Sequence, residues 1–344
     1  MNFASDNHYG ASSQILAALA AIGQSPQPAY GDDDVTQRLT ARFCEIFECE
    51  VAVFPVINGT TANALALATL VPPHGAVLCH AEAHIAVDEC GAPEFFTHGA
   101  KLVAIAGDDA KLTVAAITDA LSHFQKGFVH HAQPAAISLT QATELGTVYT
   151  PQEIAAISAL ARANDMKIHM DGARFANALV GLGCTAAELT WKSGVDVLSF
   201  GATKNGALAA EAVVFFAPKD VRDFAYRRKK SGHLLSKMRF ISTQLEVYLS
   251  DGHWLDNARR ANMLAQRLAQ GLAQARHIEI AHPVSANAVF ARMPSELAVK
   301  LRRAGAQFYD WGAPSNGQTL ARLMVSFATP EDAVARLIEA ARAG

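Results

Sequence analysis

Residues 167–206 constrain the fold of this chain more than any other stretch. At 168–172 apolar and polar residues alternate and the run closes on Asp171 followed by glycine, which predicts a strand that ends in a turn. A second short strand is predicted at 195–200, and a glycine-rich turn that contains Lys204 follows it. A strand, a helix and a second strand in this order indicate an α/β fold with a mostly parallel central sheet flanked by helices.

Asp171 and Lys204 each follow the carboxyl end of a predicted strand. In an open α/β sheet ligands bind beyond these ends, so the two side chains can face one cleft. A lone Asp-Gly is commonly a turn, and a lone lysine in a glycine-rich loop is commonly solvated. Together, however, they suit pyridoxal 5'-phosphate (PLP). The amine forms a Schiff base with the cofactor's aldehyde, and the carboxylate keeps the pyridine nitrogen protonated so that the ring accepts electrons.

The segments HMDGARFANAL and SFGATKNG resemble those of the PLP-dependent threonine aldolases, in the β-eliminating lyase group of aminotransferase fold type I. This resemblance covers nearly the whole chain. It implies that Asp171 pairs with the pyridine nitrogen and that Lys204 is the Schiff-base lysine. It also implies that Arg174 lies near the cofactor's phenolic oxygen and the substrate carboxylate. The family pattern includes no metal site.

A buried strand is predicted at 51–56, and the small and hydroxyl residues at 58–63 open the next helix. The first N–H groups of a helix and the positive end of its dipole form a site for an anion. A plain helix cap is the alternative interpretation. Placed in a chain with a PLP lysine, Gly59 and Thr60 are the expected phosphate cradle, and the family resemblance implies the same.

His84 follows a strand predicted at 76–79, and its spacing to Glu89 and Gly91 resembles the family's histidine motif. In that motif the imidazole stacks on the pyridine ring, so we expect His84 to contact the cofactor and to be the first candidate for proton transfer. His80 is the alternative. Glu89 is a candidate for orienting His84.

The loop at 140–149 follows another predicted strand, at 135–139. Some threonine aldolases place a second active-site histidine in this loop, but this sequence has none there. Gln141 and Glu144 are the polar candidates in its place. The base that takes the proton of the substrate's β-hydroxyl is therefore left open.

Other expected site residues come from segments far apart in the sequence. Threonine aldolases carry an N-terminal arm similar to the one here, so Ser5 is a candidate for binding the substrate carboxylate. The family uses a basic residue near 227–230 to reach a neighbouring subunit's cofactor phosphate, and Arg228 is the candidate. The turn at 30–33 resembles an element that approaches a neighbour's site. The resemblance thus implies a homo-oligomer, a dimer of dimers, with active sites at the subunit interface.

The pattern changes after residue 250, which predicts an N-terminal arm and large PLP-binding domain at 1–250 and a small C-terminal α/β domain at 251–344. A last strand is expected at 322–327. In fold type I an arginine on this strand holds the substrate α-carboxylate in a bidentate fork, and Arg322 fits that position. A surface arginine on an edge strand is the alternative.

The composition is that of an ordinary globular protein, with 51% hydrophobic and 18% charged residues and a formal net charge of −3. This balance gives no electrostatic argument for nucleic acid or a membrane surface as partner. No apolar run is long enough to span a bilayer. The five cysteines lack C-x-x-C spacing, which fits reduced thiols and a cytoplasmic location.

These features predict an enzyme that cleaves β-hydroxy-α-amino acids to glycine and an aldehyde. L-Threonine, L-allo-threonine and phenylserine are the candidate substrates, and the preferred side chain and the β-carbon stereochemistry are left open. A PLP-dependent β-eliminating lyase or an aminotransferase is the alternative, since the same Asp171 and Lys204 would serve it. A non-catalytic binding protein is disfavoured by the complete set of Lys204, Asp171, His84 and Arg322.

Overall fold

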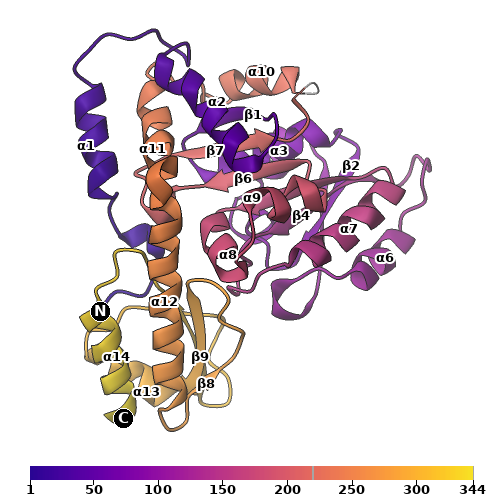
Figure 1. Cartoon of the computed structure of the whole chain (residues 1–344). Helices are drawn as coiled ribbons and strands as arrows, with labels where there is room; N and C mark the ends of the chain where they lie inside the picture. Colours follow the sequence, from indigo (N-terminus) through magenta and orange to yellow (C-terminus); the bar gives the residue numbers. More distant parts are fainter. Residues whose placement is uncertain (219–220, 344) are drawn as a thin grey trace.

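Seven strands form the larger of two β-sheets, in the order β1-β7-β6-β5-β4-β2-β3 (Figure 1). The computed structural model describes residues 1–218 and 221–343. All strands except β7 run in one direction, which confirms the predicted mostly parallel sheet. The strands are β1 (Ala52–Val56), β2 (Gly75–His80), β3 (Lys101–Ile105), β4 (Gln133–Thr140), β5 (Lys167–Gly172), β6 (Val197–Gly201) and β7 (Glu211–Phe215).

Helices cover both faces of this sheet, and the alternation of strand β5 shows why. Ile168 and Met170 point into a core that includes residues of α2, α7 and α8. Asp171 points to the opposite face, where it meets Asn63 of α3. The helices associated with the large sheet are α1 (Ser13–Ile22), α2 (Asp34–Phe47), α3 (Gly59–Leu70), α4 (His84–Val87), α5 (Ala92–Phe96), α6 (Val114–Ser122), α7 (Pro151–Ala163), α8 (Phe175–Leu182), α9 (Ala186–Leu189), α10 (Arg222–Lys230) and α11 (Arg239–Leu249).

The smaller sheet is antiparallel, in the order β10-β11-β9-β8, and has its own apolar core. The long helix α12 contributes Ala258 to the core of the large sheet and Leu264 and Leu268 to that of the small one. In Figure 1 it runs as a column from the large unit to the small one. The elements of this part are α12 (His253–Ala273), β8 (Glu279–Ile280), β9 (Ala288–Pro294), α13 (Ser295–Arg303), β10 (Tyr309–Asp310), β11 (Gln318–Met324) and α14 (Glu331–Ala343).

The N-terminal arm packs against the small unit. The N–H of Phe3 donates to the carbonyl of Gln307 at 2.8 Å, and the N–H of Met324 donates to the carbonyl of Phe3 at 2.8 Å. The ring of Phe3 belongs to the small core, and both chain termini lie at this end of the molecule (Figure 1). We propose two domains with the boundary at the predicted residue 250, with the difference that the first residues of the arm pack with the C-terminal domain.

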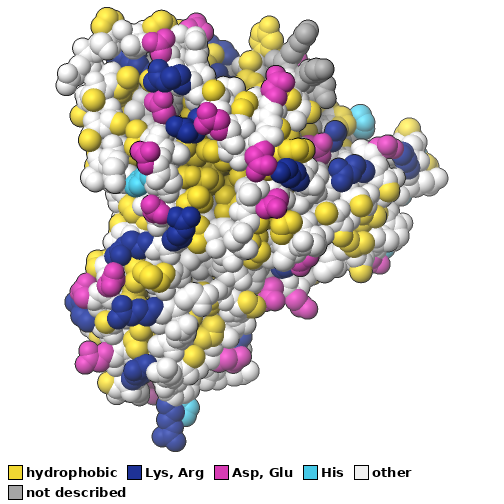
Figure 2. Space-filling view, viewed as in Figure 1, with side chains coloured by type: hydrophobic (Ala, Val, Ile, Leu, Met, Phe, Trp, Pro, Cys, Tyr) yellow, Lys and Arg dark blue, Asp and Glu magenta, His cyan; other side chains and the backbone are white. Residues whose placement is uncertain are grey.

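One element, the last strand, differs from the sequence prediction. The last strand, β11, begins four positions before the expected 322, because alternate burial already starts at Thr319 and continues through Ala321 and Leu323. The basic run at 227–230 ends a helix, α10, that packs on α3. On the face drawn in Figure 2, basic and acidic side chains are interspersed rather than gathered by sign. Within the described residues, no helix has both the length and the apolar character needed to cross a membrane.

Candidate active site

A cavity of about 430 Å³ lies at the carboxyl ends of the parallel strands. Its walls come from the segments that follow β1, β2, β4, β5 and β6, and from β11 of the small sheet. The cavity brings together all the predicted site residues except Arg228: Ser5, Gly59, Thr60, His84, Asp171, Arg174, Lys204 and Arg322. This position is the one expected for a ligand site in an open α/β sheet.

Asp171 is buried at the end of β5, and two donors fix its carboxylate. Its Oδ2 accepts from Nδ2 of Asn63 at 2.8 Å, and its Oδ1 accepts from the N–H of Ala173 at 3.0 Å. The same Asn63 Nδ2 donates to Oε1 of Glu89 at 2.8 Å. One amide from α3 therefore orients two buried carboxyl groups, and no sequence pattern marks Asn63 beyond its place in the first turns of that helix.

His84 begins α4, and its ring Nδ1 is 2.9 Å from Oε1 of Glu89. This hydrogen bond raises the pKa of His84, although burial opposes the shift. The predicted orienting role of Glu89 agrees with this contact. His80, the alternative histidine, has one ring nitrogen 2.9 Å from the Gly107 carbonyl and the other on the N–H of Glu82 at 3.0 Å. It does not line the cavity, so the structure favours His84.

Lys204 lies in a short 3₁₀ turn, η4 (Thr203–Asn205), that follows β6. Burial lowers the pKa of its amine, and the charge of Arg174 lowers it further. Both effects favour the neutral, nucleophilic amine. Glu211 at the start of β7 also lines the cavity and accepts from the N–H groups of Ala202 at 3.0 Å and Thr203 at 3.4 Å. Burial raises the pKa of Glu211 to about 7, and the sequence analysis did not identify this carboxyl.

The N-terminus of α3 opens into the cavity. The side chain of Asn58 caps the helix by accepting from the N–H of Thr61 at 2.9 Å. The preceding N–H groups, of Gly59 and Thr60, have no acceptor within the helix and line the cavity. A Cβ added at Gly59 would meet no atom within 4 Å, so the space in front of this helix end is open. This arrangement can hold an anion.

Arg174 lines the cavity but is joined to the N-terminal arm. Its Nε and Nη2 donate to the two carboxylate oxygens of Asp6 at 2.8 and 2.9 Å. Burial alone would raise the pKa of Asp6, but the charge and hydrogen bonds of Arg174 outweigh it and lower the pKa. Asp6 also accepts from Nδ2 of Asn287 in the small unit at 3.2 Å. The neighbouring Ser5 lines the cavity, and no sequence pattern marks the pairing of Asp6 with Arg174.

Arg322 reaches the cavity from β11. Its guanidinium lies over the ring of Trp311, 5.5 Å from the ring centroid. Among the described residues its buried Nε has no hydrogen-bond partner. Burial lowers the pKa of Arg322 to about 10, and Arg174 contributes in the same direction. The cavity therefore holds a guanidinium with an unused donor, and Trp311 is a further wall residue that the sequence analysis missed.

Arg228 lies apart from this cavity. It is buried on the inner side of α10, with its guanidinium 5.4 Å from the ring centroid of Phe54 and Nη1 donating to the Pro55 carbonyl at 3.3 Å. Burial lowers its pKa to about 10. Within this chain α10 turns the side chain inward against β1. A contact with a neighbouring subunit stays a prediction.

The loop after β4 distinguishes its two polar candidates. Gln141 is fully buried, and its amide is used by the backbone of Tyr149, which it meets at 2.8 and 2.9 Å. Glu144 lines the cavity, and its Oε1 accepts from the backbone N–H of His84 at 2.8 Å. Burial, and then the charge of Asp171, raise the pKa of Glu144 to about 7. Of these two residues, only Glu144 is available to a ligand in the cavity.

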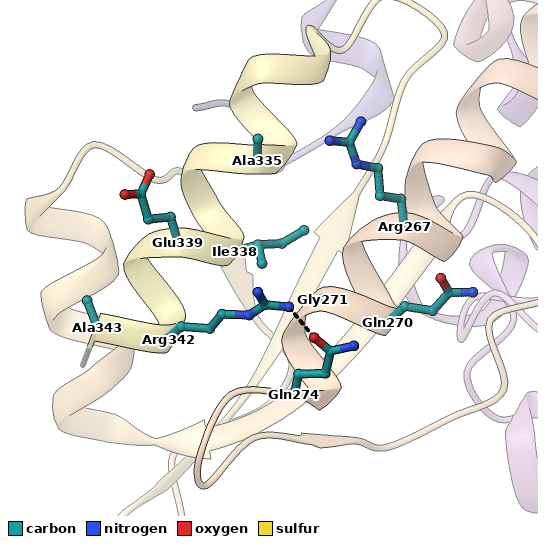
Figure 3. Close-up of a pocket in the computed structure, with 9 residues that line it drawn as sticks. All are labelled: Arg267, Gln270, Gly271, Gln274, Ala335, Ile338, Glu339, Arg342 and Ala343. Carbon is teal, nitrogen blue, oxygen red and sulfur yellow. Dashed lines mark hydrogen bonds between the residues drawn. The ribbon is translucent and has the colours of Figure 1, made fainter.

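A second hollow, of about 640 Å³, lies on the outside of the small unit between α12 and α14 (Figure 3). Arg342 spans it to donate to Gln274, and Ile338 packs against Gly271 at its base. None of the residues that the sequence singled out lines it. The cavity at the strand ends is therefore the candidate active site.

Comparisons with known proteins identify the family of this chain. A family model described as beta-eliminating lyase matches residues 2–295. The chain is 44% identical over 341 residues to a low specificity L-threonine aldolase of a Pseudomonas species, covering 99% of this chain and 97% of that protein. A protein of the same name from Pseudomonas aeruginosa is 44% identical over 335 residues, covering 97% and 95%. Among solved structures, a threonine aldolase of Leishmania major has a TM-score of 0.94 at 28% identity, covering 99% of this chain and 98% of that one.

Proposed function

This chain belongs to the beta-eliminating lyase family, and from that premise we propose that it is a PLP-dependent aldolase that cleaves β-hydroxy-α-amino acids to glycine and an aldehyde. L-Threonine and L-allo-threonine are the proposed substrates, with phenylserine as a third. The observation that carries this proposal is one cavity with a buried carboxylate, an amine of lowered pKa, an open helix N-terminus and an unpaired guanidinium. Relatives that cover nearly the whole chain are named low specificity L-threonine aldolases.

The residues of the cavity fit PLP. The fold is that of PLP fold type I, and the group requires a carboxylate for its pyridine nitrogen, an amine for its aldehyde and donors for its phosphate. Asp171 offers the carboxylate and Lys204 the amine. The open space in front of Gly59 and Thr60 offers the N–H donors for the phosphate. When bound, PLP supplies an aldehyde that captures the substrate's amine and a ring that accepts the electron pair released at Cα.

The other residues hold the substrate. We assign Arg322 to the α-carboxylate, since its buried Nε lacks a partner and Trp311 supports the guanidinium from one side. Asp6 already occupies Nε and Nη2 of Arg174, so Arg174 is left with Nη1 and its charge for the ligands. Ser5, held by the arm, is the proposed hydroxyl contact to the same carboxylate.

His84 and Asp171 act through their fixed orientation. Glu89 pairs with Nδ1 of His84, and this contact keeps the imidazole directed at the cavity. The same contact raises the pKa of the ring. The two donors to Asp171 keep its carboxylate directed at one place. We assign His84 to stacking on the cofactor ring and to proton transfer. We assign Asp171 to stabilising the charge on the protonated pyridine nitrogen, because a charge-assisted hydrogen bond is stronger than a neutral one.

The active unit is proposed to be a homo-oligomer, a dimer of dimers, in the cytoplasm. Large apolar side chains that stay exposed in the single chain support a further interface, among them Phe95 at 76% and Tyr226 at 78% exposure. The five free cysteines support a reducing location. Light scattering of the purified enzyme tests the assembly, and an active monomer would contradict it.

A product assay with L-threonine tests the proposed reaction. The purified enzyme with PLP is expected to release acetaldehyde and glycine in equal amounts. A 2-oxo acid in their place would indicate a β-eliminating lyase or an aminotransferase and would refute the proposal. The Lys204→Ala variant is the matched control, because it lacks the amine and leaves the remaining wall residues in place.

A further inference from the structure

Glu144 is a carboxyl group of the cavity that the mechanism above does not use. It lies on the loop after β4, next to His84, whose backbone N–H donates to its Oε1 at 2.8 Å. Its second oxygen, Oε2, is buried and makes no hydrogen bond of normal geometry among the described residues, although the Thr140 hydroxyl lies close enough to lower the pKa of the carboxyl. A buried carboxylate oxygen without a hydrogen-bond partner costs free energy unless a ligand or a proton satisfies it. Such an oxygen in a cavity therefore indicates a functional group.

We propose that the Glu144 carboxylate is the base that takes the proton of the substrate's β-hydroxyl group. This inference rests on the proposed function and names a role within the same site. The O–H electron pair becomes the second bond of the aldehyde C=O. The Cα–Cβ bond breaks, its electron pair stays on Cα, and Cα later takes up one proton to give glycine. Glu144 ends the step protonated and returns that proton to solvent.

Four other acids line the cavity, and each is less suited to this role. Asp88 is exposed, and its charge acts on Arg322, the residue assigned to the α-carboxylate. Asp171 and Glu211 have both carboxylate oxygens engaged by N–H donors. Oε1 of Glu89 is shared by His84 and Asn63. Its Oε2 also lacks a partner among the described residues, but the side chain has no exposed surface from which to reach a ligand. His84 itself is held towards its protonated form by Glu89, which suits donation rather than abstraction.

The protonation of Glu144 agrees with the proposal. Burial and Asp171 raise its pKa to about 7, so that near neutral pH it can both take and release a proton. Five titratable or charged residues interact with Glu144 through charge or a hydrogen bond: Asp171, His84, Arg174, Cys79 and Tyr149. A base must be ionised, so kcat/KM for L-threonine should fall as the pH drops through this value.

The test compares Glu144→Gln with the wild-type holoenzyme. Glutamine keeps the size and the oxygen that accepts from His84, but it is no base. We expect kcat for L-threonine cleavage to fall by about 10²–10⁴-fold, the usual contribution of a general base. The exchange of the glycine α-proton with D₂O, followed by NMR, should persist, because that reaction involves no β-hydroxyl. Glu144→Asp should recover part of the cleavage, and Glu82→Gln, which removes an exposed carboxyl nearby, should behave as the wild type.

A second measurement avoids catalysis altogether. Isotope-edited infrared titration of the apoenzyme should show buried carboxyl groups that titrate near pH 7, from Glu144 and Glu211. Glu144→Gln should remove one signal and Glu211→Gln the other.

Three results would overturn the inference. The first is cleavage that persists in Glu144→Gln, and the second is loss of glycine exchange in parallel with cleavage, which would mean that Glu144 only positions His84. The third is the absence of a titrating carboxyl assigned to Glu144. A wild-type enzyme that exchanges glycine but cleaves no β-hydroxy amino acid would instead refute the proposed function, and this inference with it.

Discussion

Replacing Arg322 with alanine should weaken the binding of every β-hydroxy amino acid while leaving PLP in place. The guanidinium lies on β11, and within the described chain its Nε has no partner. Its burial is strong enough to lower the pKa to about 10, so the group has already lost much of its hydration before a ligand arrives. A substrate carboxylate would therefore meet a donor that has little water to displace.

The size of the effect follows from one lost charge-assisted hydrogen bond. Such a bond contributes about 1.5–3 kcal/mol, which is roughly ten- to over a hundredfold in affinity at about 1.4 kcal/mol per decade. KM for L-threonine should rise by this factor. The planar fork also orients Cα, so kcat should fall as well. Arg322→Lys should recover only part of the loss, because a point charge cannot reproduce the fork over Trp311.

Steady-state kinetics with L-threonine and phenylserine measure the changes in KM and kcat. A titration with PLP, followed by absorbance, measures the affinity for the cofactor. The two substrates share the carboxylate, so their losses should be similar. Arg292→Ala is the matched control, since Arg292 is an exposed arginine on the adjacent strand β9. If the variant lost one substrate and kept the other, Arg322 would belong to the side-chain pocket and the assignment would be wrong. A comparable loss of PLP affinity would likewise refute it.

Three further predictions concern the other side of the cavity and the arm. Borohydride reduction of the PLP-loaded enzyme should label Lys204, as peptide mapping would show; a different labelled lysine would contradict its assignment. Asp171→Asn should lower turnover severely with the far-UV spectrum unchanged, since each pKa unit lost at its partner is about 1.4 kcal/mol; near wild-type turnover would rule Asp171 out. Asp6→Asn should lower the free energy of unfolding at pH 7 by about 3–5 kcal/mol, because Arg174 is left without its partner. The folded-state pKa of Asp6 is lowered, so its stabilisation is present above about pH 4 and is lost as the pH falls through the folded value. Urea titrations at pH 7 and pH 3, with exposed Asp119→Asn as control, should show a difference that shrinks with acid.

The sequence predicts the central site because parallel strands bring their carboxyl ends to one edge. Asp171 lies at the end of β5 and Lys204 follows β6, and Gly59, His84 and Glu144 follow three more strand ends. Alternation along β5 then decides the face, since Ile168 and Met170 must be buried on the other side. The location of the site can thus be predicted from the strand ends, whereas the role of His84 rests on the family resemblance.

Other features depend on contacts that no local pattern records. Asn63 is one polar residue inside an apolar helix, and its bond to Asp171 exists only once α3 packs over β5. Arg228 lies in a basic run, and the family resemblance predicts that it reaches a neighbouring subunit's phosphate; within this chain the orientation of α10 directs it to Pro55. The charge of a segment does not fix the direction of each side chain. Likewise, no local sequence pattern marks Trp311, which lies in a short turn, as a residue of the cavity wall.

The N-terminal arm links the placement of Arg322 to that of Lys204. Asp6 accepts from Arg174 in the large unit and from Asn287 in the small one. Three residues earlier, the carbonyl of Phe3 accepts from the N–H of Met324, on the strand that carries Arg322. In the proposed assignment the substrate's carboxylate and its reacting carbon are held by two units, which the arm joins together with α12. Loss of the Asp6 contacts should therefore weaken substrate binding before it affects the cofactor, because Asp171, Gly59 and Lys204 all belong to the large unit.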